Sequence, residues 1–336
     1  MGGRMQIDQS DLNYGDFCEM VTAYRRMAVI KAAVDCGIID GVAGGACTLE
    51  RLLLITGMKA AEGERFVRLL VSSGILHEHE GLLHLSPFSA AYLQRESEQS
   101  QRGVLEFERL LQSRWERLGD QLLEGQGSVV ENQHPREYQR RLGLFHQAMH
   151  EAAVVRSGEL WDAVGPLAAE GFIIDAGAGD GTYLRNFLKC YPGWRTLACD
   201  LDDVLARAVA DDQVSMHPCN LLDQGERLAL VDKHRGTADL LLLSNFIHCY
   251  SREEVAVMLA DLGALLAPEG MLLIHDFFTD GNGFGALYDL HMLANTYNGR
   301  TYTFAETGEL LAGAGFAVRR TLALPSMSHV VVAFRA

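Results

Sequence analysis

One stretch decides the fold of the second half of this chain: Phe172-Ile173-Ile174-Asp175-Ala176-Gly177-Ala178-Gly179-Asp180-Gly181. Its first residues are apolar and β-branched, which predicts a short buried strand of a parallel sheet. The glycines at 177, 179 and 181 let the backbone turn sharply and approach a ligand without a Cβ in the way. A helix is expected over 182–189, with its free amide groups facing the turn. The stretch therefore predicts a cradle of nucleotide size.

The residues downstream narrow the choice of ligand. A second apolar strand over 195–199 ends in Asp200, 25 residues after Asp175, where a carboxylate can bind a ribose diol. A nicotinamide enzyme shares this layout, but its pyrophosphate usually lies on a G-x-G-x-x-G helix start, whereas here the third glycine comes early. The spacing D-x-G-x-G-x-G resembles motif I of class I S-adenosylmethionine-dependent methyltransferases. A dinucleotide site and a tight turn without a ligand remain the alternatives.

Length and composition set the outer bounds. A chain of 336 residues suits two domains, and none of its apolar runs approaches the roughly 18 residues of a membrane span. The first residues lack the apolar segment of a signal peptide, so we expect a soluble, cytoplasmic protein. The net charge of −15 disfavours a nucleic-acid partner. The seven cysteines are scattered without a C-x-x-C pair, which indicates neither a disulfide framework nor a thiolate metal site.

The first hundred residues predict a winged helix. Helices are expected over 11–40, from Thr48 onward and over 62–73, and a hairpin is expected around Gly81. Such a module could read DNA, but it carries nine Lys and Arg against 13 Asp and Glu, whereas a DNA-reading helix needs a cationic face. We therefore interpret 1–100 as a dimerisation domain of a homodimer. The hairpin also carries three histidines, for which solvated side chains are favoured over a metal site: His77, His79 and His84.

A helical linker is expected over 101–165 and an alternating strand and helix domain over 166–336. The linker is rich in long apolar side chains, and we predict that it contributes to the dimer and that Phe145 and Met149 line the substrate pocket. In the last domain the repeated order of strand and helix implies a doubly wound, Rossmann-like α/β sheet of parallel strands. Its ligands should collect at the carboxyl ends of those strands.

Further motifs of this domain make the resemblance specific. Together they resemble the small-molecule O-methyltransferases of plant and bacterial secondary metabolism, which include the caffeic acid type and also begin with a winged-helix dimerisation domain. The matching runs are Asp175-x-Gly177-x-Gly179-x-Gly181, Asp200, Cys219-Asn220-Leu221-Leu222, Ser244-x-x-Ile247-His248, Leu266-x-Pro268-x-Gly270, Asp276-Phe277, Asp289-Leu290-x-Met292-Leu293, Gly299-Arg300-x-Tyr302-Thr303 and Ala314-Gly315-Phe316.

The resemblance implies a site for S-adenosyl-L-methionine. Its methionine moiety is expected to pass over Gly177 and Gly179, and Asp200 to hold the ribose hydroxyls. Asn220 stands where the family has an aspartate before the apolar adenine contact, and Ser244 stands where plant members have a lysine. The full set of cofactor-binding residues expected from the family is Asp175, Gly177, Gly179, Asp200, Leu201, Asn220, Leu221 and Ser244.

The resemblance also implies a catalytic base. His248 matches the family's general base, which takes the proton of an acceptor hydroxyl, and Asp276 matches one of two acidic residues that flank it. The second acidic position aligns with Thr301, and Cys249 follows the histidine where plant members have aspartate. One orienting carboxylate is therefore expected, namely Asp276. Some members of the family have lost methyl transfer or rely on proximity alone.

The acceptor site is expected around the helix that contains Asp289-Leu290-His291-Met292-Leu293. His291 and Asn295 are predicted to contact the small-molecule acceptor, an aromatic or conjugated compound methylated on a hydroxyl. The alternatives are C-methylation, assisted by a metal held between His248 and His291, and a winged-helix regulator without enzyme activity. We expect no metal and no membrane span.

Overall fold

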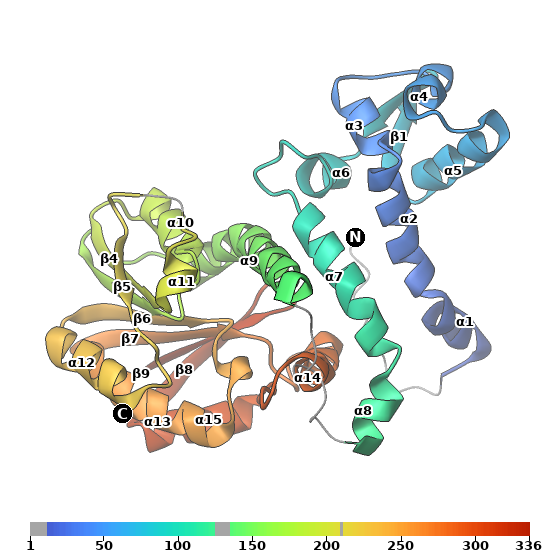
Figure 1. The fold of residues 1–336 in the computed structure, drawn as a ribbon. Coiled ribbons are helices and arrows are strands. Elements are labelled where there is room, and N and C mark those ends of the chain that lie inside the picture. Colours follow the sequence, from blue (N-terminus) through green and yellow to red (C-terminus); the bar gives the residue numbers. More distant parts are fainter. Residues whose placement is uncertain (1–11, 125–134, 209–210) are drawn as a thin grey trace. The chain divides into compact units, whose positions relative to one another are not determined.

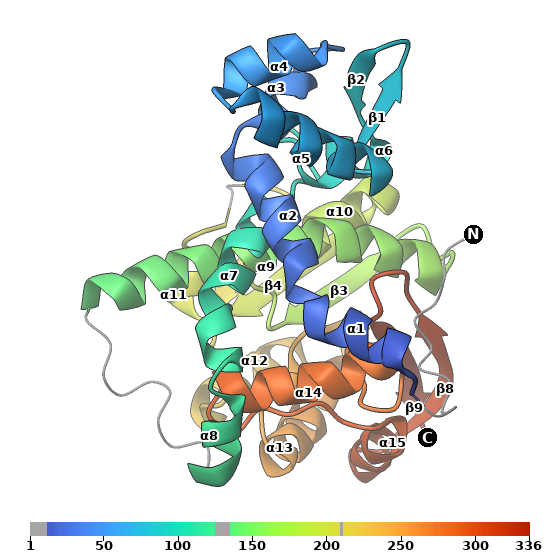
Figure 2. The same ribbon diagram turned by 90° about the vertical axis from the view of Figure 1, so that its right-hand side faces the viewer.

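The computed structural model describes residues 12–124, 135–208 and 211–336, and its chain divides into two compact units. The amino-terminal unit contains 12–110 and 139–152 of the described residues, and the carboxy-terminal unit contains the remainder. Each unit is drawn in Figures 1 and 2 and is described separately below. None of the helices within these described ranges is both long and apolar enough to cross a membrane.

The amino-terminal unit is a group of helices with a two-stranded hairpin (Figure 2). Its buried side chains come from successive helices and from the hairpin, and include Ile38, Leu52 and Leu70. The elements are α1 (Tyr14–Thr22), α2 (Tyr24–Asp35), α3 (Ile38–Ala43), α4 (Leu49–Thr56), α5 (Ala60–Ser72), β1 (Leu76–His79), β2 (Leu82–Leu85), α6 (Pro87–Tyr92) and the first part of α7 (Arg102–Trp115). From residue 111 onward α7 belongs to the carboxy-terminal unit.

The single helix expected over 11–40 is wrong, because the structure divides that segment into three helices. At Ala23 the backbone hydrogen bonds tighten to neighbours three residues apart, from Ala23 to Met20 and from Arg26 to Ala23. Gly37 then takes a left-handed conformation, with φ of 73°, before α3 begins. The predicted start at Thr48 is confirmed, since its hydroxyl accepts a hydrogen bond from the Arg51 amide at 3.3 Å.

Two further helices follow α7, namely α8 (Leu118–Glu124) and α9 (Pro135–Val164). The break that the sequence suggests at Gly125-Gln126-Gly127 lies outside the described residues. The end of α9 belongs to the carboxy-terminal unit, where Leu160, Trp161 and Val164 are buried against the sheet.

The carboxy-terminal unit is built on a seven-stranded sheet of order β5-β4-β3-β6-β7-β9-β8 (Figure 1). The chain moves from β3 outward to β4 and β5, then returns to pair β6 with the other edge of β3. A ligand site is expected at such a switch point, at the carboxyl ends of the strands. The strands are β3 (Gly171–Ala176), β4 (Trp194–Asp200), β5 (Ser215–Pro218), β6 (Ala238–Ser244), β7 (Leu266–Asp276), β8 (Phe316–Ala323) and β9 (His329–Arg335).

The predicted fold class is confirmed, with one correction to the sheet. Strands β3 to β7 are parallel, but β9 runs antiparallel to both β7 and β8, so the sheet is mixed. The strands β8 and β9 are joined by a short loop instead of a helix, and such a connection can only reverse the chain direction. The helix that follows β4 is short, since α11 spans Asp202–Leu205.

Helices cover both faces of this sheet (Figure 1). One face is buried against α9 and α10, and the other against α12, α13 and α15. The β-branched and leucine side chains of β3 and β6 contribute to both clusters, as expected for strands covered on both sides. The remaining helices of the unit are α10 (Thr182–Cys190), α12 (Gln224–His234), η1 (Ile247–Cys249), α13 (Arg252–Leu262), η2 (Gly263–Leu265), α14 (Gly283–Asn295) and α15 (Phe304–Gly313).

Candidate active site

The glycine turn after β3 is held against the end of β4. The amides of Gly177 and Ala178 both donate to the carbonyl oxygen of Cys199, at 2.8 and 3.1 Å. Gly177 has a φ of 86°, and a Cβ built on it would lie 2.2 Å from the ring of Phe246. No side chain fits at this position, because the turn is both left-handed and in contact with an aromatic ring. The open backbone of the turn faces the switch point of the sheet.

Two carboxylates lie beside this turn. Asp200 accepts hydrogen bonds from the amides of Gly179, at 2.8 Å, and Leu201, at 2.7 Å. Burial still raises its pKa above the usual value, although both amides oppose that shift. Asp175 is fully buried, and neither of its oxygens has a hydrogen-bond partner among the described residues. Burial, reinforced by the charge of Asp200, raises the pKa of Asp175 well above its usual range.

The segment after β5 completes this end of the site. The amide of Cys219 donates to the Asp200 carbonyl at 2.9 Å, which places Asn220 and Leu221 next to the end of β4. The Asn220 side chain accepts from the Leu222 amide at 3.1 Å, so its oxygen is used within its own turn. Leu221 is buried, whereas Leu201 is exposed.

Beyond the end of β6 the backbone takes an unusual conformation at Asn245, with φ of 49°. Its side-chain amide donates to the hydroxyl of Tyr183 at 3.0 Å and to that of Ser244 at 3.1 Å. The Ser244 hydroxyl also lies 3.0 Å from Nδ1 of His275. Burial lowers the pKa of His275 to about 3, so this imidazole is neutral and its contact with the Ser244 hydroxyl joins two uncharged groups.

The end of β7 meets the short helix η1 at a buried histidine and carboxylate pair. Nδ1 of His248 lies 2.5 Å from Oδ1 of Asp276, and the His248 amide donates to Oδ2 at 3.4 Å. Burial is the largest single effect and lowers the pKa of His248. The charge of Asp276, smaller charge effects of Cys249 and Tyr288 and the hydrogen bond to Asp276 together outweigh burial, so the net pKa lies well above the usual range. Asp276 thus fixes both the ring orientation and the Nδ1–H tautomer. The other ring nitrogen, Nε2, is left to act on a ligand.

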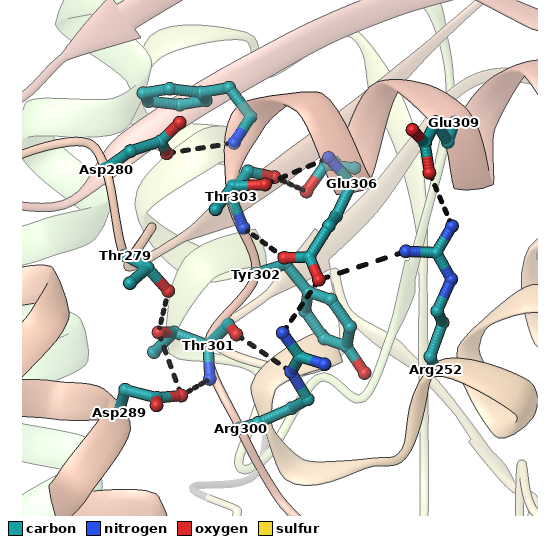
Figure 3. A network of polar contacts seen from close by, with 12 residues as sticks. Arg252, Thr279, Asp280, Asp289, Arg300, Thr301, Tyr302, Thr303, Glu306 and Glu309 are labelled. Atoms are coloured by element: carbon teal, nitrogen blue, oxygen red, sulfur yellow. Dashed lines mark hydrogen bonds and ion pairs between the residues drawn. The ribbon is translucent and has the colours of Figure 1, made fainter.

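Thr301 is part of a separate network, shown in Figure 3. Its hydroxyl lies 2.6 Å from that of Thr279, and its amide donates to Asp289 at 2.7 Å. Nearby, Arg300 pairs with Glu306 at 2.8 Å, at the first turn of α15. None of the hydrogen bonds that Thr301 forms within the described ranges involves His248. Asp276 is therefore the residue that orients the imidazole there.

Helix α14 adds aromatic side chains next to His248. The ring of Tyr288 meets the His248 imidazole edge to face, with centroids 5.2 Å apart, and it stacks on His291 at the same distance. The ring centroid of Trp115 lies 6.2 Å from that of His291. Burial lowers the pKa of His291 to about 4, so this imidazole is neutral near neutral pH. Asn295, one turn later, accepts a hydrogen bond from Arg114 at 3.0 Å.

Comparison with known proteins identifies the family. A family model described as the O-methyltransferase domain matches residues 115–317, and one described as the O-methyltransferase dimerisation domain matches 18–95. The chain belongs to the O-methyltransferase family. Family membership, predicted from the motifs, is thereby confirmed.

Individual relatives of this O-methyltransferase family member are distant. The 3-amino-4-hydroxybenzoate 4-O-methyltransferase of Streptomyces cremeus is 30% identical over 169 residues, which are 48% of this chain and 44% of the relative. The matches span about half the length of the first curated relatives. Among solved structures, CalO1, a methyltransferase in calicheamicin biosynthesis, superposes with a TM-score of 0.78 at 22% identity, covering 97% of this chain and 100% of that one. Human N-acetylserotonin methyltransferase in complex with SAM gives 0.78 at 20% identity, with both chains fully covered. These two likenesses show the fold.

In this O-methyltransferase family member, most residues predicted for the site gather at one edge of the sheet. The set from Asp175 to Ser244 lies at or directly after the carboxyl ends of β3 to β6. His248 and Asp276 form a pair, and His291 and Asn295 are both on α14. Phe145 and Met149 belong to the amino-terminal unit, so their place in the pocket stays a prediction. Sequence reasoning missed Tyr288, although it lies three residues before His291 on the same helical face. Among the described residues, no group of three or more metal-ligating side chains is arranged to hold an ion.

Proposed function

We propose that this protein is an S-adenosylmethionine-dependent methyltransferase that methylates a hydroxyl group of an aromatic or conjugated small molecule, with His248 as general base. The observation that carries the proposal is the buried His248 and Asp276 pair beside the glycine turn. Nδ1 of His248 is hydrogen-bonded to Asp276, so Nε2 is the nitrogen that can take a proton from the acceptor.

The residues around the turn fit S-adenosylmethionine. The backbone of Gly177 can approach the ligand because a Cβ there is excluded by Phe246. We propose that Asp200 accepts hydrogen bonds from the ribose hydroxyls, with Leu201, Asn220 and Leu221 around the nucleoside; the two amides that hold its carboxylate support this role. The unpartnered carboxylate of Asp175 suits the positively charged methionine end.

The cofactor supplies an electrophilic methyl group on a sulfonium. His248 would accept the hydroxyl proton on Nε2 as the acceptor oxygen bonds to the methyl carbon. The carbon–sulfur bond of the cofactor would break in the same step, and S-adenosylhomocysteine would be the leaving group. The charge of Asp276 stabilises the imidazolium that results, which is consistent with the raised pKa of His248. A phenol has a pKa of about 10, so a positioned base makes it a far better nucleophile and contributes about 10²–10⁴ in rate.

The acceptor class is supported by the aromatic side chains near His248. Tyr288 and His291 form a stacked pair beside the base, and Phe277 lies 4.3 Å from the Tyr288 ring. Flat apolar walls of this kind suit a conjugated ring, and neutral His291 with Asn295 offers hydrogen bonds to its substituents. Phe145 and Met149 are proposed to add to this pocket.

The cofactor is tested by calorimetry. Purified protein should bind S-adenosylmethionine and S-adenosylhomocysteine at one site per chain, and Asp200→Ala should abolish binding while the circular dichroism spectrum is unchanged. The control is Asp202→Ala, which removes an exposed carboxylate at the start of the next helix. Absence of heat with both compounds, together with binding of NADH, would place the protein among the oxidoreductases.

The role of His248 as general base is tested with an acceptor that is first identified in a mass-spectrometric screen of hydroxylated aromatic compounds. His248→Ala should lower kcat/KM by about 10²-fold or more. His234→Ala, which removes an imidazole from α12, should retain activity. A loss below roughly tenfold in His248→Ala would show that positioning alone carries the rate, and product methylated on carbon would replace the O-methyl assignment.

A further inference from the structure

Arg156 extends from α9 toward the ends of β6 and β7. Its Nη1 donates to the side-chain oxygen of Asn245 at 3.3 Å, and its guanidinium carbon lies 4.9 Å from the centroid of the Phe277 ring. Both partners follow strand ends at the site, since Phe277 comes directly after Asp276. These contacts place a half-buried cation at the same edge of the sheet as His248.

This cation lacks the partner that comparable arginines have. Arg185 pairs with Asp180 at 3.4 Å, and Arg227 pairs with Asp261 at 2.8 Å. Within the parts of the chain that the structure describes, Arg156 has no carboxylate within ion-pair distance, and its one hydrogen bond is the neutral contact with Asn245. A guanidinium withdrawn from water without an anion is unfavourable, so the site is suited to receive one.

The surroundings of Arg156 join the two parts of the site. Asn245 also donates to the hydroxyl of Tyr183 at 3.0 Å. Burial raises the pKa of that hydroxyl, the charge of Arg156 lowers it and the charge of Asp175 raises it, so both charges act on this group. The other contact of Arg156 is Phe277, whose ring packs on Tyr288, and Tyr288 contacts His248. Arg156 therefore lies between the glycine turn, where the methionine end of the cofactor is expected, and the aromatic wall, where the acceptor is expected.

We propose that Arg156 binds a carboxylate of a ligand in the active site. The planar guanidinium can donate two parallel hydrogen bonds to a carboxylate, a geometry that neither Asn245 nor Ser244 offers. The inference rests on the proposed function, which supplies two sources of this chemistry. One is the α-carboxylate of the methionine moiety, and the other is a carboxylate on an aromatic acceptor.

The first arm of the test separates the cofactor from the acceptor. Calorimetry measures S-adenosylhomocysteine and 5′-methylthioadenosine, which lacks the amino-acid end, on wild type, Arg156→Gln and Arg156→Lys. If the cofactor supplies the carboxylate, Arg156→Gln should lower the affinity for S-adenosylhomocysteine about tenfold or more and leave the affinity for methylthioadenosine unchanged. Arg156→Lys should lie between wild type and Arg156→Gln. The matched control is Arg195→Gln, since Arg195 also covers a phenylalanine ring, Phe172 at 4.7 Å, but at the amino end of the strands.

The second arm uses 4-hydroxybenzoate and its methyl ester as probes, each with S-adenosylhomocysteine present. If the acceptor supplies the carboxylate, Arg156→Gln should bind S-adenosylhomocysteine as wild type does and lose the preference for the acid over the ester. The proposal is overturned if Arg156→Gln changes S-adenosylhomocysteine binding less than about threefold and discriminates acid from ester as wild type does. A wild type that binds neither nucleoside would instead contradict the proposed function.

Discussion

At the scale of single residues, Asp175 shows how the site departs from what stability alone favours. Its carboxylate is fully buried without a described partner, and its pKa in the folded protein is raised by burial and by Asp200. A raised carboxyl pKa means that the ligand-free fold loses stability as the pH rises above the unfolded value of about 3.9. The loss continues until the folded pKa is passed. The carboxylate is therefore retained at a cost that a cationic ligand could offset.

We predict that Asp175→Asn raises the stability of the ligand-free protein near neutral pH and weakens the binding of S-adenosylhomocysteine. An amide of the same shape removes the buried charge, and a gain of about 1 kcal/mol corresponds to roughly 2–4 °C in Tm for a unit of this size. Scanning calorimetry gives Tm, and titration gives the affinity. A lower Tm in the variant would mean that the carboxylate has a stabilising partner.

His248 gives a prediction about pH. The neutral imidazole is the base, and its pKa is raised by Asp276, so kcat/KM of the wild type should still increase with pH above the usual histidine range of about 6.5. In Asp276→Asn the charge of Asp276 is gone and burial, which lowers the pKa of His248, becomes dominant, so the acid limb of the profile should shift to lower pH while the maximal rate falls. Asp289→Asn, which touches Thr301 instead of His248, should leave the limb in place. If the acid limb does not shift in Asp276→Asn, Asp276 is not the group that orients His248.

At the scale of elements, the turn between β3 and α10 depends on Gly177. Alanine there would have to adopt a φ of 86° and place its Cβ 2.2 Å from the Phe246 ring. We predict that Gly177→Ala lowers the free energy of unfolding by more than 1–2 kcal/mol, roughly the cost of the backbone strain alone. Urea denaturation provides the measurement. Gly236→Ala, with φ of 66° and no neighbour within 4 Å, carries the strain without the clash. Equal losses in the two variants would show that the ring moves aside freely.

Much of the central sheet could be predicted from sequence, because its strands are apolar runs bounded by turns. The strand expected from Phe172 is found as Gly171–Ala176, and the apolar run of β6 forms a strand from Ala238 to Ser244. By contrast, β8 was missed because Arg319 and Arg320 interrupt an edge strand that is largely exposed. No helix lies between β8 and β9, so they also lack the alternation of strand and helix from which the earlier strands were predicted.

The site was predictable where a residue follows a strand, and not where it comes from a packed helix. His248 and Asp276 lie near strand ends, and the topology brings them together. Arg156 and Tyr288 are on α9 and α14, and no local pattern separates them from ordinary helix residues. Their positions depend on tertiary packing, through Phe277 and Asn245. Asn245 itself adopts a left-handed φ that a sequence cannot specify.

At the scale of the whole molecule, the amino-terminal unit exposes large apolar side chains along α1. Tyr14 is 79% exposed and Met20 63%, and Phe17 between them is 55% exposed. They recur at spacings of three residues, so they form one face of the helix. A continuous apolar face of this kind is unfavourable in water unless another surface covers it. The match to a dimerisation domain begins within α1, at residue 18, and supports a second copy of the chain as the partner of this unit.

We predict that the protein is a homodimer and that Phe17→Glu combined with Met20→Glu shifts it to a monomer. Buried charges would oppose the association, whereas the fold of one chain should be unaffected because neither side chain is buried within it. Light scattering at micromolar concentration measures the mass, and circular dichroism checks folding. Val257→Glu, at a half-exposed position on α13 in the other unit, should stay dimeric. A monomeric wild type would overturn the prediction, and retention of duplex DNA at physiological salt would favour a regulator, because the acidic unit otherwise repels phosphate.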